Sequence, residues 1–138
     1  MNVQEVYEFM DGEKLAVLST ARKDARPEAA LMGFAMTPEL EIVFDTVRNS
    51  RKYPILKENP RVAWVVGCTS EITVQYEGEA SELEGEELAR YKKVYFEKFP
   101  DGPERESWPG ITYFVVRPKW VRYCDYNPGT RRIEEREF

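Results

Sequence analysis

The chain of 138 residues contains no histidine. Without an imidazole, it cannot build a Ser-His-Asp or Cys-His nucleophile pair, a histidine-ligated zinc or haem iron, or a histidine general base. Any chemistry that it performs therefore needs a reactive group from another source.

Cysteines are also few, and long apolar runs are absent. Cys68 and Cys124 lie far apart with no CxxC spacing, which favours two reduced, buried thiols over a metal site. The longest apolar run, Val62 to Val66, is too short to cross a bilayer, and the first 14 residues are too acidic for a signal peptide. We therefore expect a cytoplasmic protein with no membrane partner.

Acidic residues outnumber basic ones by 25 to 20, giving a formal charge of −5, with six acids and no base between residues 77 and 87. This balance argues against a nucleic-acid partner, although a local basic patch could still bind a small anion. The length and the 42% hydrophobic content fit one globular domain spanning residues 1–138.

Hydrophobic periodicity predicts short helices between β-strands. The expected helices are 2–11, 50–58 and 86–99, and the expected strands are 15–21, 28–36, 41–46, 61–67, 71–83, 111–117 and 119–125. Gly78 invites a bend in its long strand. Residues 100–110 form a Pro/Gly-rich loop, and 126–138 are expected to form a polar surface tail. Strands without βαβ alternation predict a mainly β (α+β) fold, an antiparallel barrel with flanking helices.

The most informative segment runs from Val43 to Lys52, from a strand end into a helix start with Ser50 as the expected N-cap. It gathers three cations with two hydroxyls and free backbone N–H groups, which together suit a phosphate dianion. These side chains are Arg48, Arg51, Lys52, Thr46 and Ser50. An ordinary basic surface turn is the alternative interpretation.

The surrounding motifs resemble the pyridoxamine 5′-phosphate oxidase-like family of FMN-binding split barrels. The series covers about residues 5–125 in the family's order and spacing. It consists of Leu-Ala-Val-Leu-Ser-Thr at 15–20, Arg26-Pro27, Ile-Val-Phe-Asp-Thr at 42–46 before Asn-Ser-Arg-Lys at 49–52, Glu-Asn-Pro-Arg-Val-Ala at 58–63 and Glu-Gly-Glu-Ala at 77–80.

The resemblance implies a six-stranded, Greek-key split barrel that forms a homodimer with one FMN in each of two clefts between the subunits. Arg51 and Lys52 would hold the FMN phosphate with help from Arg48, while Thr46 and Ser50 would donate hydroxyl hydrogen bonds.

The resemblance also assigns positions along the flavin ring. The strand Ala30-Leu31-Met32-Gly33 would pass beside the ring; Gly33 would allow close approach, or alternatively mark a strand bulge. Either Thr73 or Gln75 would face the cofactor. The family's late aromatic and basic residues, which approach from the partner subunit, correspond to Trp120 and Arg122. Trp108 could approach from its loop, and each tryptophan could instead serve only core packing.

Departures from the family pattern narrow the expected function. Ala35 stands where pyridoxamine phosphate oxidases carry a second basic residue, and the missing histidine further disfavours vitamin B6 oxidation and haem degradation. The short general-stress-protein-like members fit better.

The resemblance then implies an FMN-dependent oxidoreductase that passes electrons from a reduced nicotinamide to a small acceptor, because the flavin supplies the reactive atom. A non-catalytic flavin carrier or sensor and a deazaflavin-dependent reductase remain alternatives. FAD also remains open, although no GxGxxG motif is present.

Overall fold

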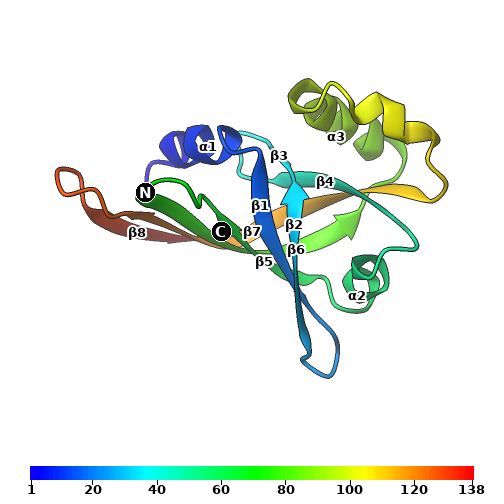
Figure 1. The fold of residues 1–138 in the computed structure, drawn as a ribbon, viewed down its shortest axis with the longest axis horizontal. Coiled ribbons are helices and arrows are strands. Elements are labelled where there is room, and N and C mark those ends of the chain that lie inside the picture. The colour runs from blue at the N-terminus through cyan, green and yellow to red at the C-terminus, as the bar shows by residue number, and fades with distance from the viewer.

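A computed structural model describes all residues 1–138 as a curled antiparallel sheet with flanking helices (Figure 1). In chain order its elements are α1 (Val3–Asp11), β1 (Leu15–Ala21), β2 (Pro27–Gly33), β3 (Ala35–Met36), β4 (Ile42–Val47), α2 (Lys52–Glu58), β5 (Arg61–Val66), β6 (Ile72–Glu82), α3 (Gly85–Lys98), the 3₁₀ helix η1 (Gly102–Ser107), β7 (Ile111–Asp125) and β8 (Arg132–Glu137).

The sheet is an open half-barrel. Its strands follow the order β2-β1-β5-β6-β7-β4-β3, every pairing is antiparallel, and β8 pairs with β7. Strands β2 and β3 end this path, so the outer edge of β2 has no strand partner. The mainly β, antiparallel split-barrel fold expected from the sequence is confirmed.

Aromatic side chains fill the concave face of the sheet. Phe44 stacks on Phe114 with ring centroids 5.4 Å apart, and Trp64 meets Phe44 edge-on at 5.6 Å. A second apolar cluster lies beneath α3, where Tyr95 stacks on Phe99. These two clusters hold the half-barrel rigid and clamp α3 against it, because tightly packed interiors resist deformation.

The helices start close to their expected positions. At α1, the Asn2 side chain accepts a hydrogen bond from the Glu5 amide, while Val6 and Met10 are buried on one face. Both α1 and α3 contact β3, whereas α2 packs against β1 near the opposite end of the sheet (Figure 1). None of the helices is long and apolar enough to span a membrane.

Three strand predictions need correction. The expected strand 28–36 is interrupted at Phe34, which separates β2 from β3. The expected strands 111–117 and 119–125 are one continuous strand, β7. Pro118 is tolerated within it because the pairing of β6 and β7 shifts register beside Gly78, so the missing N–H falls at an irregularity.

Two further expectations are wrong. Residues 132–137, expected to belong to a polar surface tail, are mostly exposed but form the strand β8, which pairs with β7 from Trp120 to Asp125 and completes a long hairpin arm (Figure 1). Their alternation of charged and apolar residues is too weak to predict a strand without its partner. Cys124 is buried as expected, but Cys68 is exposed because it lies in the turn that follows β5.

Candidate functional site

The segment Arg48–Lys52, which we call the basic turn, is held in shape by hydrogen bonds that its Ser50 side chain makes with the flanking residues. The Thr46 hydroxyl donates to the Ser50 hydroxyl oxygen at 3.0 Å, and that oxygen accepts the Tyr53 amide at 3.3 Å. Helix α2 begins at Lys52, later than expected, yet Ser50 still makes a capping bond to its first turn. These hydrogen bonds hold the turn against the start of α2.

Arg48 lies on the side of the basic turn that faces β6. Its amide donates to the Gly110 carbonyl, and its guanidinium lies 3.8 Å from the Glu82 carboxylate. Burial opposes ionisation of Glu82, but hydrogen bonds from the Tyr53 hydroxyl at 2.7 Å and Lys57 outweigh it and lower the Glu82 pKa. Glu82 therefore remains an anion that offsets part of the positive charge here.

A hollow of about 370 Å³ opens beside Arg48, lined also by Glu82, Lys92 and Glu106. Lys92 is paired with Glu106 at 2.6 Å. This hollow therefore has mixed charge, and only Arg48 links it to the basic turn.

Arg51 lies at the open edge of the half-barrel, where its side chain is 79% exposed. Its guanidinium is 3.4 Å from the carboxylate of Glu28, which belongs to β2. Lys52 is half-buried and makes no ion pair. The structure thus places the basic turn beside the edge strand that was expected to pass along a flavin ring.

The predicted ring-facing strand has two different faces. Ala30 and Met32 alternate with Leu31, which is 65% exposed on the convex side. At Gly33 a Cβ would come within 3.1 Å of the Phe99 ring, so packing against α3 is enough to explain this glycine. The bulge alternative does not apply, since Gly33 pairs regularly with Leu15.

The other predicted residues gather on β6 and β7. Gln75 lies directly opposite Arg122, and Glu77 lies opposite Trp120. The Thr73 hydroxyl donates to the Val66 carbonyl, whereas the exposed Gln75 amide makes no hydrogen bond. Of the two alternatives, Gln75 is therefore the residue free to meet a ligand.

Exposed apolar residues continue this surface across the convex side of the sheet. Val17 pairs with both Leu31 and Val65, and Val65 pairs with Gln75, so these side chains form one row. The row continues through Arg122 to Glu135 on β8, whose carboxylate lies 3.4 Å from the Arg122 guanidinium. The three apolar residues in the row are 37–65% exposed. A groove of about 480 Å³ lies nearby, lined by Glu77 and Lys119 on either side of the Trp120 position.

No hydrogen bond or ion pair joins a side chain of this convex row to the basic turn; Arg51 pairs with Glu28, and Arg122 pairs with Glu135. Trp108 is 52% exposed and precedes Gly110, whose carbonyl accepts the Arg48 amide, so its loop is joined to the basic turn through the backbone. The predicted residues therefore form two groups, one at the open edge and one on the convex face.

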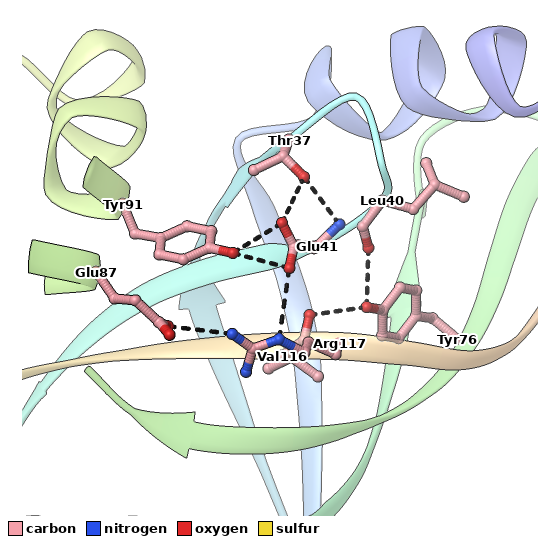
Figure 2. Close-up of polar contacts among 8 residues, drawn as sticks. All are labelled: Thr37, Leu40, Glu41, Tyr76, Glu87, Tyr91, Val116 and Arg117. Atoms are coloured by element: carbon pink, nitrogen blue, oxygen red, sulfur yellow. Dashed lines mark hydrogen bonds and ion pairs between the residues drawn. The ribbon is translucent and has the colours of Figure 1, made fainter. Parts of the chain in front are cut away.

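A second polar cluster, the Glu41 cluster, lies where α3 meets the barrel (Figure 2). Glu41 accepts the Tyr91 hydroxyl at 2.9 Å and the Thr37 hydroxyl at 3.3 Å, and it lies 3.7 Å from Arg117. Arg117 also pairs with Glu87 on α3. Burial, reinforced by the Glu41 carboxylate, raises the Tyr91 pKa. Every carboxylate in this cluster has a partner, so it is suited to fastening α3 rather than to binding a ligand.

Sequence reasoning missed Glu28, Tyr53 and Glu82 as parts of the site. Glu28 shares the alternation of Ala30 and Met32 on β2, which could have placed it on their face. Its pairing with Arg51, and the pairing of Glu82 with Arg48, connect distant segments and depend on the folded arrangement.

An antiparallel half-barrel with flanking helices defines the split-barrel class of folds. The profile of the pyridoxamine 5′-phosphate oxidase family matches residues 3–125, so the chain belongs to this family. A search of curated proteins found no match.

Solved structures share the fold at low sequence identity. General Stress Protein 26 from Bacillus anthracis str. Sterne is 24% identical over the full length of both chains, with a TM-score of 0.76. A heme binding protein from Mycobacterium smegmatis has a TM-score of 0.83 at 17% identity; the match covers 98% of this chain but only 57% of that one. HutZ, a heme storage protein from Vibrio cholerae, has a TM-score of 0.70 at 18% identity, covering 86% of this chain and 91% of that one.

Proposed function

We propose that this protein binds FMN, with Arg51 and Lys52 holding the phosphate. The observation that carries the proposal is the basic turn, an ordered cationic segment at the open edge of an acidic protein. Charged hydrogen bonds from a guanidinium and an ammonium suit a phosphate. The family match supports this use of the turn.

Each residue of the basic turn has a defined part in the proposed binding. Arg51 is exposed enough to reorient toward a phosphate, and Lys52 is free of ion pairs. The Ser50 oxygen accepts hydrogen bonds from the Thr46 hydroxyl and the Tyr53 amide, so the Ser50 hydroxyl proton remains free to donate to a phosphate oxygen. Arg48 supplies a further positive charge beside them.

The proposed activity is transfer of electrons from a reduced nicotinamide to a small acceptor. The bound flavin would supply the redox chemistry, through a ring that accepts hydride. The protein would orient the ring along Ala30–Gly33 and exclude water from it. No side-chain acid or base is required, in keeping with a chain that has no histidine.

We further propose that the protein works as a homodimer. The row formed by Leu31, Val17 and Val65 exposes apolar side chains that a second copy would cover. Because this row continues through Gln75 and Arg122, such a contact would also bring these residues and Trp120 toward the partner's basic turn. The two groups of predicted residues would then form one site.

The first test is the visible spectrum of the purified protein, followed by mass identification of any compound released on denaturation. We expect a flavin band in the spectrum and FMN as the released compound. Release of FAD or a deazaflavin instead would identify that compound as the cofactor. A colourless protein that does not bind added FMN would contradict the proposal. Sedimentation should give a dimer, and a flavin-loaded monomer would contradict the shared site.

The second test separates an enzyme from a carrier or sensor. Anaerobic addition of NADH or NADPH should bleach the flavin band rapidly if the protein is an oxidoreductase. Flavin that stays oxidised with both donors would favour a carrier or sensor.

Haem binding is the second candidate function, because two structural neighbours are a heme binding protein and a heme storage protein. Without histidine, an iron ligand here would have to be another side chain such as the exposed thiol of Cys68. Titration with haem, followed by the Soret band in the parent and in Cys68→Ser, tests this candidate directly. We expect no saturable complex.

A further inference from the structure

Glu28 is an acidic residue beside Arg51, one of the two proposed phosphate ligands. Its side chain is 16% exposed, and one oxygen, Oε2, is 3.4 Å from the Arg51 guanidinium. No other ion pair is formed by either residue. Arg51, the expected phosphate ligand, therefore already has an anionic partner within the same chain.

The ion pair leaves the carboxylate incompletely satisfied. Oε2 is buried and makes no aligned hydrogen bond, even to Arg51. A buried charge that loses its partner is strongly unfavourable, and polar atoms without a hydrogen bond are uncommon in protein interiors. Glu28 therefore depends on Arg51 for compensation, whereas the more exposed Arg51 can turn elsewhere.

We infer that Glu28 competes with the phosphate of the bound ligand for Arg51 and thereby determines how strongly the site prefers phosphorylated over unphosphorylated flavin. This inference rests on the proposed function. A phosphate that engages Arg51 must draw the guanidinium away from Glu28, or share it. In both cases two negative groups face each other across one cation, which weakens binding of the phosphorylated ligand.

Glu28 competes through its negative charge, so it should affect the affinity for FMN and not the affinity for riboflavin. Both carry the same ring and the same polyol chain, but only FMN carries the phosphate. Removing the Glu28 charge should strengthen FMN binding and leave riboflavin binding nearly unchanged. A purely structural role would shift both ligands together, because distortion of β2 would affect the ring as well.

The test measures dissociation constants of FMN and riboflavin by flavin fluorescence for apoprotein carrying Glu28→Gln. Gln keeps the size of the side chain while removing its charge. We expect FMN affinity to rise on the order of tenfold, an electrostatic effect reduced by the exposure of Arg51. Riboflavin affinity should change less than about twofold. Glu58→Gln removes the same charge from the exposed end of α2 and is the matched control.

A second variant, Glu28→Ala, keeps the inference testable if Glu28→Gln disturbs folding. Circular dichroism and thermal unfolding show whether each variant is folded. Unchanged or weaker FMN binding by a folded variant would overturn the inference while leaving FMN binding itself intact. Equal gains for FMN and riboflavin would overturn it as well. If neither the parent nor any variant binds FMN, the proposed function fails, and the inference fails with it.

Discussion

The Glu41 cluster and the basic turn use similar side chains for different purposes. In the Glu41 cluster, Glu41 accepts two hydroxyl donors, and the Arg117 guanidinium donates a hydrogen bond to Glu87 at 3.1 Å (Figure 2). In the basic turn, the guanidinium groups are exposed and lie 3.4–3.8 Å from their carboxylates. Polar groups that hold the fold together are saturated by one another, whereas those of the basic turn keep donors free for a ligand.

The comparison also concerns what each region connects. The Glu41 cluster ties α3 to β7 and to the turn before β4, so its loss should loosen the fold. The basic turn is braced from beneath by Thr46, Ser50 and Glu82, while its cations project from the surface. Substitutions should therefore separate stability from ligand binding.

The largest expected effect is on ligand binding by Arg51→Ala combined with Lys52→Ala. Losing two charged hydrogen bonds, each worth roughly 1.5–3 kcal/mol, should weaken FMN binding on the order of a hundredfold or more. The free energy of unfolding of the apoprotein should fall by only about 1–2 kcal/mol, because Glu28 loses its partner but the Arg51 side chain itself is largely exposed.

Fluorescence titration and urea unfolding measure these two quantities. Arg22→Ala with Lys23→Ala removes the same charge from the loop between β1 and β2 and serves as the control. FMN binding equal to that of the parent would remove the basic turn from the site.

An intermediate effect on stability is expected for Tyr91→Phe. The variant deprives the Glu41 carboxylate of a hydroxyl donor in a half-buried position, and we expect a loss of about 2 kcal/mol in the free energy of unfolding. Its FMN affinity should match that of the parent. Urea unfolding measures the free energy of unfolding, with Tyr126→Phe at an exposed tyrosine as the control. A change below about 0.5 kcal/mol for Tyr91→Phe would show that the Glu41 cluster does not fasten α3.

The smallest effect should come from Tyr53→Phe and should depend on pH. The Glu82 pKa is lower in the folded protein than in the unfolded chain. Glu82 therefore stabilises the fold at pH values above its ordinary pKa of about 4.3. That contribution is lost as the pH falls through the pKa of the folded state. Removing the Tyr53 hydroxyl raises the folded pKa, so the variant should be about 1 kcal/mol less stable at neutral pH.

Urea unfolding of parent and variant from neutral to acidic pH checks this prediction. The difference between them should narrow as the pH drops below about 4.3, where Glu82 becomes protonated in the unfolded chain. A difference that is constant with pH would mean that the hydroxyl acts through packing rather than through the charge of Glu82.

Local patterns predicted most of the fold. Alternating apolar residues identified the strands, and the helices were expected within a few residues of their observed limits. The failures share one cause. Strand β8 and the unbroken course of β7 depend on pairing partners, and a segment such as Arg-Ile-Glu-Glu-Arg-Glu shows little strand character until β7 lies beside it.

The sequence by itself determined the family, the mainly β fold and the position of the basic turn, because motifs, hydrophobic periods and charge runs are local properties of the chain. Tertiary structure alone decided which acids face those cations and which residues share the convex row. Glu28 meets Arg51, and Gln75 meets Arg122, through strand order and register, and a shift by one residue would turn these side chains to the opposite face.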